Sequence, residues 1–515
     1  MNLPELFESS VKRLGERRVM VFEGRDYTNI ELLDIGKRLH SGLKNLGVGK
    51  GDNVVMCLIN DPMVYPVFQG IFRNGAAAIP VMFALTSPEM KFILSDCKAK
   101  GVITDAFSID RVREAVKDLE HIKWIAIRGG EDNLSGLIPE YSMQGLMEND
   151  PEEELPSISE QDLAMMLYTS GTTGKPKGVM LTHESLFFCS RVAMEAAELD
   201  RWDSPQISIA TLPLAHIFGV MVMLADSLIP ERLRDGYMVL MAWFEPEKYM
   251  QLIQEHKANQ LAVVPTMLAF ILNHPKVSEY DLTSIHEVTS GGAALPLEQD
   301  KAFSKLAGLD SVRQIYGNTE CCGLATSTRK SESHPPGSVG KVYPEMELAI
   351  FDGDENPLPA FEKGEIVVKG PAVMKGYLNR PEATTETIVD GWLHTGDVGY
   401  LDEKGFLFIT DRKKDMIIRG GENIYPCELE EVMYQHPAVA EAAVVGTPDP
   451  VYGENVIGFV VLKQGEKATA EDIIEFMKTS ISKFKVPSEI NFLDALPKSS
   501  VGKILKRELR EQKIK

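Results

Sequence analysis

The stretch Tyr168-Thr-Ser-Gly-Thr-Thr-Gly-Lys-Pro-Lys-Gly178 carries the strongest signal in this chain. Its eleven residues contain four serine or threonine hydroxyls, three glycines and two lysines. The apolar run 163–167 before it predicts a buried strand. The segment after Gly178 predicts the start of a helix, with Thr182 and Ser185 as capping residues. The chain is therefore expected to pass from a strand through a polar loop into a helix.

The composition of this loop suits a polyphosphate ligand. Glycines let backbone N–H groups approach phosphate closely, hydroxyls donate to its oxygens, and lysines neutralise its charge. The spacing Gly-x-x-x-x-Gly-Lys-[Ser/Thr] of the common nucleotide-triphosphate loop cannot be drawn through it. A flexible polar turn is the alternative, which so many hydroxyls and lysines between glycines disfavour.

Length and charge limit the classes of function. With 515 residues the chain exceeds one core, so two or more domains are expected. The net charge of −21 argues against a general affinity for nucleic acid or for anionic membranes. An anionic ligand must then be met by local lysines and arginines.

The sequence predicts a cytoplasmic protein. Its first residues carry acids where a signal peptide would need bases, and no apolar run approaches a membrane span. Transient membrane contact stays open, as does the choice between a monomer and a homodimer. The six cysteines form no Cys-x-x-Cys pair, and adjacent Cys321 and Cys322 are typical of small packing residues.

Apolar runs and helical segments alternate between residues 50 and 315. This alternation predicts mostly parallel sheets covered by helices, with ligands at the carboxyl ends of the strands. The segments 87–97 and 246–256 are the clearest predicted helices. The predicted strands are 54–59, 101–104, 124–127, 207–210, 260–264 and 287–289.

The pattern changes after about residue 335. Short strands at 337–342, 346–350, 364–368 and 405–409 follow one another without crossover helices, which predicts an antiparallel, barrel-like subdomain over 335–411. The large domain is thus expected to cover 1–411. The charged segment 412–415 is a predicted hinge, and 416–515 is a predicted small, mobile α+β domain with the order β-α-β-β-α-β.

Seven motifs in order resemble the adenylate-forming superfamily of acyl-CoA synthetases, luciferases and peptide-synthetase adenylation domains, over nearly the whole chain. They are Tyr168 to Gly178, Leu212-Pro-Leu-Ala-His-Ile-Phe-Gly219, Ser290-Gly-Gly-Ala-Ala-Leu295, Tyr316-Gly-Asn-Thr-Glu320, Gly391-Trp-Leu-His-Thr-Gly-Asp397, Asp411-Arg-Lys-Lys-Asp415 and Pro497-Lys-Ser-Ser-Val-Gly-Lys503. The resemblance implies two half-reactions. A carboxylate attacks the α-phosphate of ATP to give an acyl-adenylate and pyrophosphate, and the thiol of coenzyme A then displaces AMP.

The resemblance assigns residues to the phosphates of ATP. Glu320 is the expected Mg²⁺ ligand, since a hard cation prefers oxygen ligands, and Thr319 is the expected catalytic contact to the α-phosphate. Without its motif, Glu320 could also be an ordinary carboxylate at a helix start. The expected ligands of the outer phosphates are Thr169, Ser170, Gly171, Thr172, Thr173, Gly174, Lys175 and Lys177.

Other motif residues are expected around the nucleoside. Asp397 would accept both ribose hydroxyls, because one carboxylate has two oxygens, and Arg412 would hold the same ribose. Tyr316 would stack on adenine, although a core tyrosine is the alternative. The backbone expected beside the base is Gly291, Gly292, Ala293 and Gly317, and a tight strand-to-helix turn is the alternative for the glycine pair.

The resemblance makes Lys503 the catalytic lysine. Its ammonium would bridge the substrate carboxylate and the α-phosphate oxygens as charge shifts between them. A solvated lysine among neighbouring lysines is the alternative without the motif. Lys414 occupies the hinge position, and rotation there would bring Gly420 and Gly421 to the site, where a pantetheine arm could pass close to backbone.

The acyl pocket is expected between the His216 motif and the Tyr316 motif. His216 would lie at its mouth as a neutral ring, and a core histidine is the alternative. The predicted pocket residues are His216, Phe218, Met221, Trp243, Gly291 and Gly317. None of the expected walls is charged, which disfavours dicarboxylic and amino acids, since an unpartnered buried charge is costly.

A medium- or long-chain fatty acid is therefore the predicted substrate of an AMP-forming acid–CoA ligase. An aromatic or arylalkanoic acid is the alternative with the same mechanism. Acyl transfer to a carrier protein and a luciferase-like monooxygenase also remain open. A non-catalytic binding protein is disfavoured because Lys503, Glu320 and Asp397 are all present.

Overall fold

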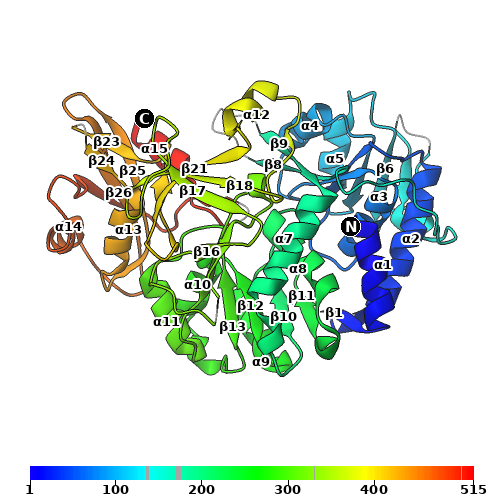
Figure 1. The fold of residues 1–515 in the computed structure, drawn as a ribbon, viewed down its shortest axis with the longest axis horizontal. Helices are drawn as coiled ribbons and strands as arrows, with labels where there is room; N and C mark the ends of the chain where they lie inside the picture. The colour runs from blue at the N-terminus through cyan, green and yellow to red at the C-terminus, as the bar shows by residue number, and fades with distance from the viewer. Residues whose placement is uncertain (135–137, 170–175, 330, 421, 500–501, 515) are drawn as a thin grey trace.

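A computed structural model describes residues 1–134, 138–169, 176–329, 331–420, 422–499 and 502–514 (Figure 1). Over these residues the chain forms two large sheets, a smaller antiparallel sheet and a C-terminal sheet. The ranges also contain no helix that is both long and apolar enough to cross a bilayer.

The first large sheet has eight strands and contains the strand that leads into the polar loop. It is parallel from β8 to β7, and β9 and β19 add an antiparallel edge. In spatial order its strands are β19 (Gly376–Tyr377), β9 (Lys177–Thr182), β8 (Leu163–Thr169), β4 (Ala77–Pro80), β3 (Asn53–Cys57), β5 (Gly101–Asp105), β6 (Trp124–Arg128) and β7 (Glu140–Ser142).

The second large sheet has nine strands and forms the floor of the site described below. Its central strands are parallel, and β15, β16 and β2 pair antiparallel at its edges. In spatial order the strands are β16 (Lys341–Val342), β15 (Thr326–Ser327), β14 (Arg313–Tyr316), β13 (Glu287–Ser290), β12 (Gln260–Val263), β10 (Ile207–Ala210), β11 (Tyr237–Leu240), β1 (Arg18–Phe22) and β2 (Arg25–Thr28).

Helices cover both large sheets, as the alternating pattern predicts. Along β3, Val55 and Cys57 pack into one core with α4 and α5, whereas Val54 and Met56 face the main core with α3, because side chains alternate along a strand. The helices of the large domain are α1 (Leu3–Leu14), α2 (Asn29–Asn45), α3 (Val64–Arg73), α4 (Ser87–Asp96), α5 (Ile109–Val116), α6 (Met143–Met147), α7 (His183–Ala196), α8 (Ile217–Ala225), α9 (Pro246–His256), α10 (Pro265–Leu272), α11 (Leu297–Ala307) and α12 (Pro381–Thr387).

The predicted strands and helices of the large domain are confirmed, with two corrections. Residues 179–181 belong to β9 and not to a helix, although Thr182 caps α7 as predicted and Ser185 completes its capping box. The predicted strand 337–342 is reduced to Lys341–Val342 and joins the nine-stranded sheet. In both cases a neighbouring strand offers backbone hydrogen bonds that the local sequence pattern does not encode.

The smaller antiparallel sheet confirms the barrel-like subdomain. Its strands are β17 (Glu347–Phe351), β18 (Gly364–Lys369), β21 (Trp392–Leu401), β20 (Ile388–Val389) and β22 (Leu407–Arg412). Its neighbouring strands pair antiparallel throughout the described residues. This sheet ends at the charged segment that the sequence marks as a hinge.

The C-terminal residues form a separate α+β unit at one end of the molecule (Figure 1). It contains the predicted β-α-β-β-α-β order, preceded by one further short strand and followed by a helix. Its elements are β23 (Ile417–Arg419), β24 (Glu422–Ile424), α13 (Pro426–Tyr434), β25 (Val439–Asp449), β26 (Gly453–Leu462), α14 (Ala470–Lys478), β27 (Glu489–Phe492) and α15 (Lys506–Ile514). The domain limits at 411 and 416 and the hinge role of 412–415 stay predictions.

Candidate active site

The loop before α15 brings Lys503 from the C-terminal unit onto the nine-stranded sheet. A Cβ atom placed on Gly292 would lie 4.0 Å from Cε of Lys503, and one placed on Gly502 would lie 2.5 Å from Oγ1 of Thr266. Gly502 has a φ of +79°, so a glycine suits both its conformation and its close approach to α10. The structure therefore brings the predicted catalytic lysine of the C-terminal unit beside Gly292.

Charges of both signs act on the Lys503 ammonium. Burial and the Arg412 guanidinium lower the pKa of Lys503, while Asp397 and Glu320 oppose that shift. The ammonium thus lies within electrostatic range of the residues that the resemblance assigns to ribose and to metal. Its predicted role of neutralising two anions requires such neighbours.

Tyr316, Asp397 and Arg412 form one connected group. The Tyr316 hydroxyl donates to Oδ2 of Asp397 at 2.8 Å, and Nε of Arg412 lies 3.2 Å from Oδ1. Arg412 and Asp397 face each other because they are paired in register on β22 and β21. Asp397 is buried, and this burial raises its pKa despite the attraction of Arg412. Tyr316 is also buried. Because its ring is held by packing, its hydroxyl keeps the Asp397 carboxylate in one orientation.

Glu320 is held by a residue that the sequence analysis did not single out. It lies in η5 (Thr319–Cys321), where the Tyr377 hydroxyl donates to its Oε1 at 2.9 Å. Nζ of Lys177 lies 4.7 Å from the centre of the Tyr377 ring. Tyr377 thus connects the end of the polar loop to the predicted metal ligand. Its position on the edge strand β19 gave no sequence signal.

The carboxylate of Glu320 fits a cation that takes most of its ligands from the substrate and from water. Among the described residues, no group of three or more His, Cys, Asp or Glu side chains could hold a metal. Glu320 supplies one carboxylate, whose Oε1 is already oriented by Tyr377. Mg²⁺ commonly binds proteins through one or two carboxylates and completes its shell with phosphates and water.

Two glycines of the predicted site are required by close packing. A Cβ on Gly317 would lie 2.4 Å from the carbonyl carbon of Gly323, and one on Gly291 would lie 2.7 Å from Cγ1 of Ile315. Gly292 has a φ of +81°, and Ala293 beside it is exposed. The backbone at the carboxyl ends of β13 and β14 is therefore open to a flat ligand on one side.

His216 caps the N-terminus of α8 and is close enough to Lys503 to sense its charge. Its Nδ1 accepts a hydrogen bond from the Phe218 backbone N–H at 3.3 Å. Burial and the Lys503 ammonium lower the pKa of His216 to about 4, so its ring is neutral near neutral pH. With Nδ1 accepting, Nε2 carries the proton and can donate to an oxygen.

A cavity of about 140 Å³ lies below the carboxyl ends of β13 and β14. Phe218 and Met221, two of the predicted pocket residues, line it together with Val222, Ile315 and Leu324. The predicted wall Trp243 does not line this cavity and is 60% exposed. His216, Gly291 and Gly317 are likewise absent from its lining, so their place in an acyl pocket stays a prediction.

Part of the cavity lining is polar, which the sequence did not predict. The polar residues of the lining are Gln206, Ser208, Asp226, Gln260, Thr289, Arg313 and Tyr343. The expectation of uncharged walls is therefore wrong for Asp226 and Arg313. Their positions could not be read from a motif, because Asp226 follows α8 and Arg313 begins β14.

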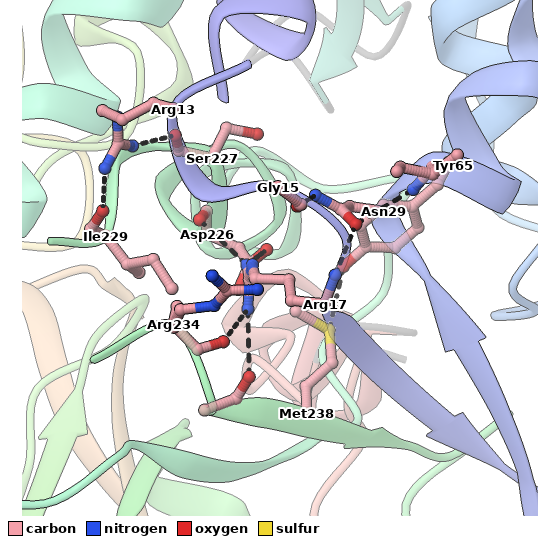
Figure 2. Close-up of polar contacts among 12 residues, drawn as sticks. Arg13, Gly15, Arg17, Asn29, Tyr65, Asp226, Ser227, Ile229, Arg234 and Met238 are labelled. Atoms are coloured by element: carbon pink, nitrogen blue, oxygen red, sulfur yellow. Dashed lines mark hydrogen bonds and ion pairs between the residues drawn. The ribbon is translucent and has the colours of Figure 1, made fainter. Parts of the chain in front are cut away.

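The N-terminal segment clamps one wall of this cavity (Figure 2). The Arg17 guanidinium pairs with Asp226 and donates to the Gly236 carbonyl at 3.0 Å. Arg13 donates to the Ile229 carbonyl at 2.6 Å and to the Ser227 carbonyl at 3.0 Å. Arg17 is buried, so the bonds of Arg13 and Arg17 hold the backbone of 226–236 against the N-terminal segment.

Several predicted residues cannot be located. Ser170, Gly171, Thr172, Thr173, Gly174, Lys175 and Gly421 lie outside the described residues. Thr169 lies at the end of β8, paired with Lys177. Lys414 is exposed in the turn after β22, and Gly420 is exposed in the hairpin of β23 and β24, with a φ of +61°. Their hinge and pantetheine roles stay predictions.

Comparison with known proteins gives the family. Residues 7–378 match the family described as AMP-binding enzyme, and residues 428–503 match the AMP-binding enzyme C-terminal domain. The chain is 35% identical to a long-chain-fatty-acid–CoA ligase of Bacillus subtilis, over 99% of this chain and 94% of that protein. It is 34% identical to a feruloyl-CoA synthase of an Amycolatopsis species, over 95% of this chain and 94% of that protein.

A solved structure supports the same assignment. ATP-bound MatB from Rhodopseudomonas palustris superposes with a TM-score of 0.88 at 28% identity, covering 99% of each chain. ATP, a carboxylic acid and coenzyme A are the substrates of such enzymes, and Mg²⁺ is expected for the family. This chain belongs to the family of AMP-binding enzymes, as an adenylate-forming acid–CoA ligase that produces AMP.

Proposed function

We propose that the acid activated by this ligase is an aryl or arylalkanoic acid, bound with its carboxylate near Lys503 and its ring in the cavity beneath Gly291. The observation that carries this proposal is the size of the cavity. At about 140 Å³ it is close to an engineered protein cavity of about 150 Å³ that binds benzene. The similarity to a feruloyl-CoA synthase agrees with it.

A medium-chain fatty acid is the second candidate. The apolar middle of the cavity, formed by Phe218, Met221, Val222 and Leu324, would accept an alkyl chain. The identity with a long-chain-fatty-acid–CoA ligase favours this candidate. A long chain would have to pass polar residues of the lining, such as Gln206 and Gln260. It would cover these buried polar groups without pairing them.

The proposed mechanism uses the charges around Lys503. Its ammonium holds the attacking carboxylate and the α-phosphate oxygens, which repel each other, in one place. The Nε2–H of neutral His216 orients the carboxylate at the mouth of the cavity. Asp397, with Arg412 and Tyr316, holds the ribose. Bound Mg²⁺ on Glu320 would neutralise the charge of the leaving pyrophosphate.

The second half-reaction requires the ammonium to leave. We propose that rotation near Lys414 withdraws Lys503 and admits the pantetheine arm along Gly420 and Gly421. The thiol then displaces AMP from the acyl-adenylate. The interdomain contacts that would break include the Leu297 N–H to Glu431 at 3.1 Å and the Lys498 ammonium over Phe270 at 5.0 Å.

A screen of acids tests this proposal. Pyrophosphate release and thioester formation are measured for benzoate, 3-phenylpropanoate, octanoate and palmitate, each with and without coenzyme A. We expect 3-phenylpropanoate or octanoate to give the highest kcat/KM and palmitate the lowest. Preference for palmitate would contradict the proposed acid class. Formation of ADP would contradict the mechanism.

A further inference from the structure

The first turn of α11 is capped by a side chain of the C-terminal unit. Pro296 precedes α11 and makes no side-chain hydrogen bond to it, since a proline side chain carries no acceptor. The Leu297 N–H instead donates to the Glu431 carboxylate, at 3.1 Å to Oε1 and 3.4 Å to Oε2. Glu431 lies on α13. The free N–H groups and the partial positive charge of a helix start both favour a carboxylate there.

The first turn of α13 is capped in the other direction, from before the 412–415 segment. Tyr425 precedes this helix and supplies no side-chain cap, and the Cys427 N–H donates to Oδ2 of Asp411 at 2.9 Å. Asp411 is buried and lies on β22, in the antiparallel sheet. Each of the two helices thus receives its capping carboxylate from the other side of the segment. Both bonds require the present orientation of the C-terminal unit.

The bond to α11 is the main attraction that holds the Glu431 carboxylate. Burial raises the pKa of Glu431, and the hydrogen bond from the Leu297 N–H is the strongest effect that opposes this rise. Glu298 and Lys301 act on Glu431 with opposite signs. These two residues of α11 also pair with each other, at 2.8 Å. The helix start, and not a neighbouring cation, therefore holds this side chain.

Within the C-terminal unit, α13 is tied to the element that follows Lys503. Glu430, the neighbour of Glu431, pairs with the Lys506 ammonium at 2.8 Å, and both side chains are largely buried. The Glu430 carboxylate also accepts the Val444 N–H at 2.7 Å. A buried pair of this kind is costly to break, so α13 and the start of α15 move together. The position of α13 is thus transmitted to Lys503.

One short connection of the large domain meets both Glu431 and Lys503. Gly292 lies in the connection between β13 and α11, and Leu297 is the first residue of α11. Cε of Lys503 lies 4.0 Å from a Cβ atom placed on Gly292, while the Leu297 N–H binds Glu431. A displacement of α13 from α11 would therefore move the Lys503 ammonium away from the backbone that is expected beside the adenine.

We propose that Glu431 is a positioning residue for adenylate formation, which by capping α11 holds the C-terminal unit where Lys503 reaches the reacting groups. This proposal rests on the role that the proposed function gives to Lys503. Glu431 touches no substrate and acts through α13. Its loss lowers the share of molecules in which Lys503 is in place, whereas the thioester step does not use Lys503. The ratio of the thioester rate to the adenylation rate therefore rises.

Separate half-reactions test the proposal. Adenylate formation is measured as pyrophosphate release with 3-phenylpropanoate and with octanoate. Thioester formation is measured with the two synthetic acyl-adenylates and coenzyme A. In Glu431→Ala the ratio of the thioester rate to the adenylation rate should rise by about 3-fold to about 30-fold, the effect of removing a carboxylate from a helix start. Glu431→Gln should give a smaller rise, because its amide oxygen can still accept the Leu297 N–H.

Glu428→Gln is the matched control. Glu428 lies on the same helix, but its carboxylate pairs with Lys485 inside the C-terminal unit, at 2.7 Å. The ratio of the two rates should be the same in Glu428→Gln as in the unaltered enzyme. Circular dichroism checks that each variant is folded.

Hydrogen exchange provides a readout that needs no substrate. The Cys427 N–H, which donates to Asp411, should exchange faster in Glu431→Ala and at the unaltered rate in Glu428→Gln. An unchanged ratio or unchanged exchange in Glu431→Ala would overturn the proposal, as would equal effects in Glu428→Gln. Failure of the proposed function would show in the unaltered enzyme, as no pyrophosphate release with either acid, and the exchange of Cys427 would still test the cap.

Discussion

Replacing Gly502 with alanine should slow one half-reaction and spare the other. The new Cβ would lie 2.5 Å from Oγ1 of Thr266, and the φ of +79° would be retained only with strain. The collision exists only while the Lys503 loop rests on α10. Overpacking of this kind costs about 1–3 kcal/mol, which would lower the rate of adenylate formation by about 5-fold to about 150-fold.

The assay measures the half-reactions separately. Pyrophosphate release reports adenylate formation, and a synthetic acyl-adenylate with coenzyme A reports thioester formation, which we expect to be unchanged. Gly465→Ala is the control, because Gly465 has a φ of +83° with nothing within 4 Å of its added Cβ. Adding Thr266→Ala to Gly502→Ala should recover most of the lost rate. Equal loss in both half-reactions, or in Gly465→Ala, would refute the reasoning.

Three further predictions concern the nucleotide site, the clamp and pH. Asp397→Asn should raise the KM for ATP by about 10-fold to about 150-fold, because a hydrogen bond to a charged group is lost. The near-ultraviolet circular dichroism should not change. An unchanged KM would remove Asp397 from the ribose site. Arg17→Met should lower the free energy of unfolding in urea by about 3 kcal/mol, because it leaves Asp226 unpaired, whereas Arg18→Met at an exposed pair should have little effect. Burial lowers the pKa of His40 and of His183 to about 4. In the unfolded chain each histidine binds a proton at about pH 6.5, so the folded state has its full stability above that pH and loses stability as the pH falls towards 4. The free energy of unfolding should fall by about 2 kcal/mol for each histidine between pH 7 and pH 5. A urea midpoint that does not change over this range would contradict both pKa shifts.

The fold was accessible from the sequence because periodicity and burial agree over long segments. β5 and β6 each read as short apolar runs bounded by turn signals, and the structure buries nearly all of their side chains. Strand β9 was missed, since residues 179–181 gain their strand partners only from β8 and β19. Long-range pairing of this kind is not encoded in local pattern.

The candidate site could be predicted only in part from the sequence. Lys503, Asp397, Arg412 and Glu320 were found through motifs, and the structure brings their charges together. The polar residues that line the cavity were not predicted from the sequence. Arg313 and Tyr343 lie outside the motifs, and tertiary packing brings them into the cavity lining.

The division of labour assigned to Lys503 is tested most directly by Lys503→Ala in the two half-reactions. We predict that this variant loses acid-dependent pyrophosphate release while it still converts a supplied acyl-adenylate and coenzyme A to the thioester at the unaltered rate. Loss of both half-reactions to the same extent, or retention of pyrophosphate release, would contradict the account.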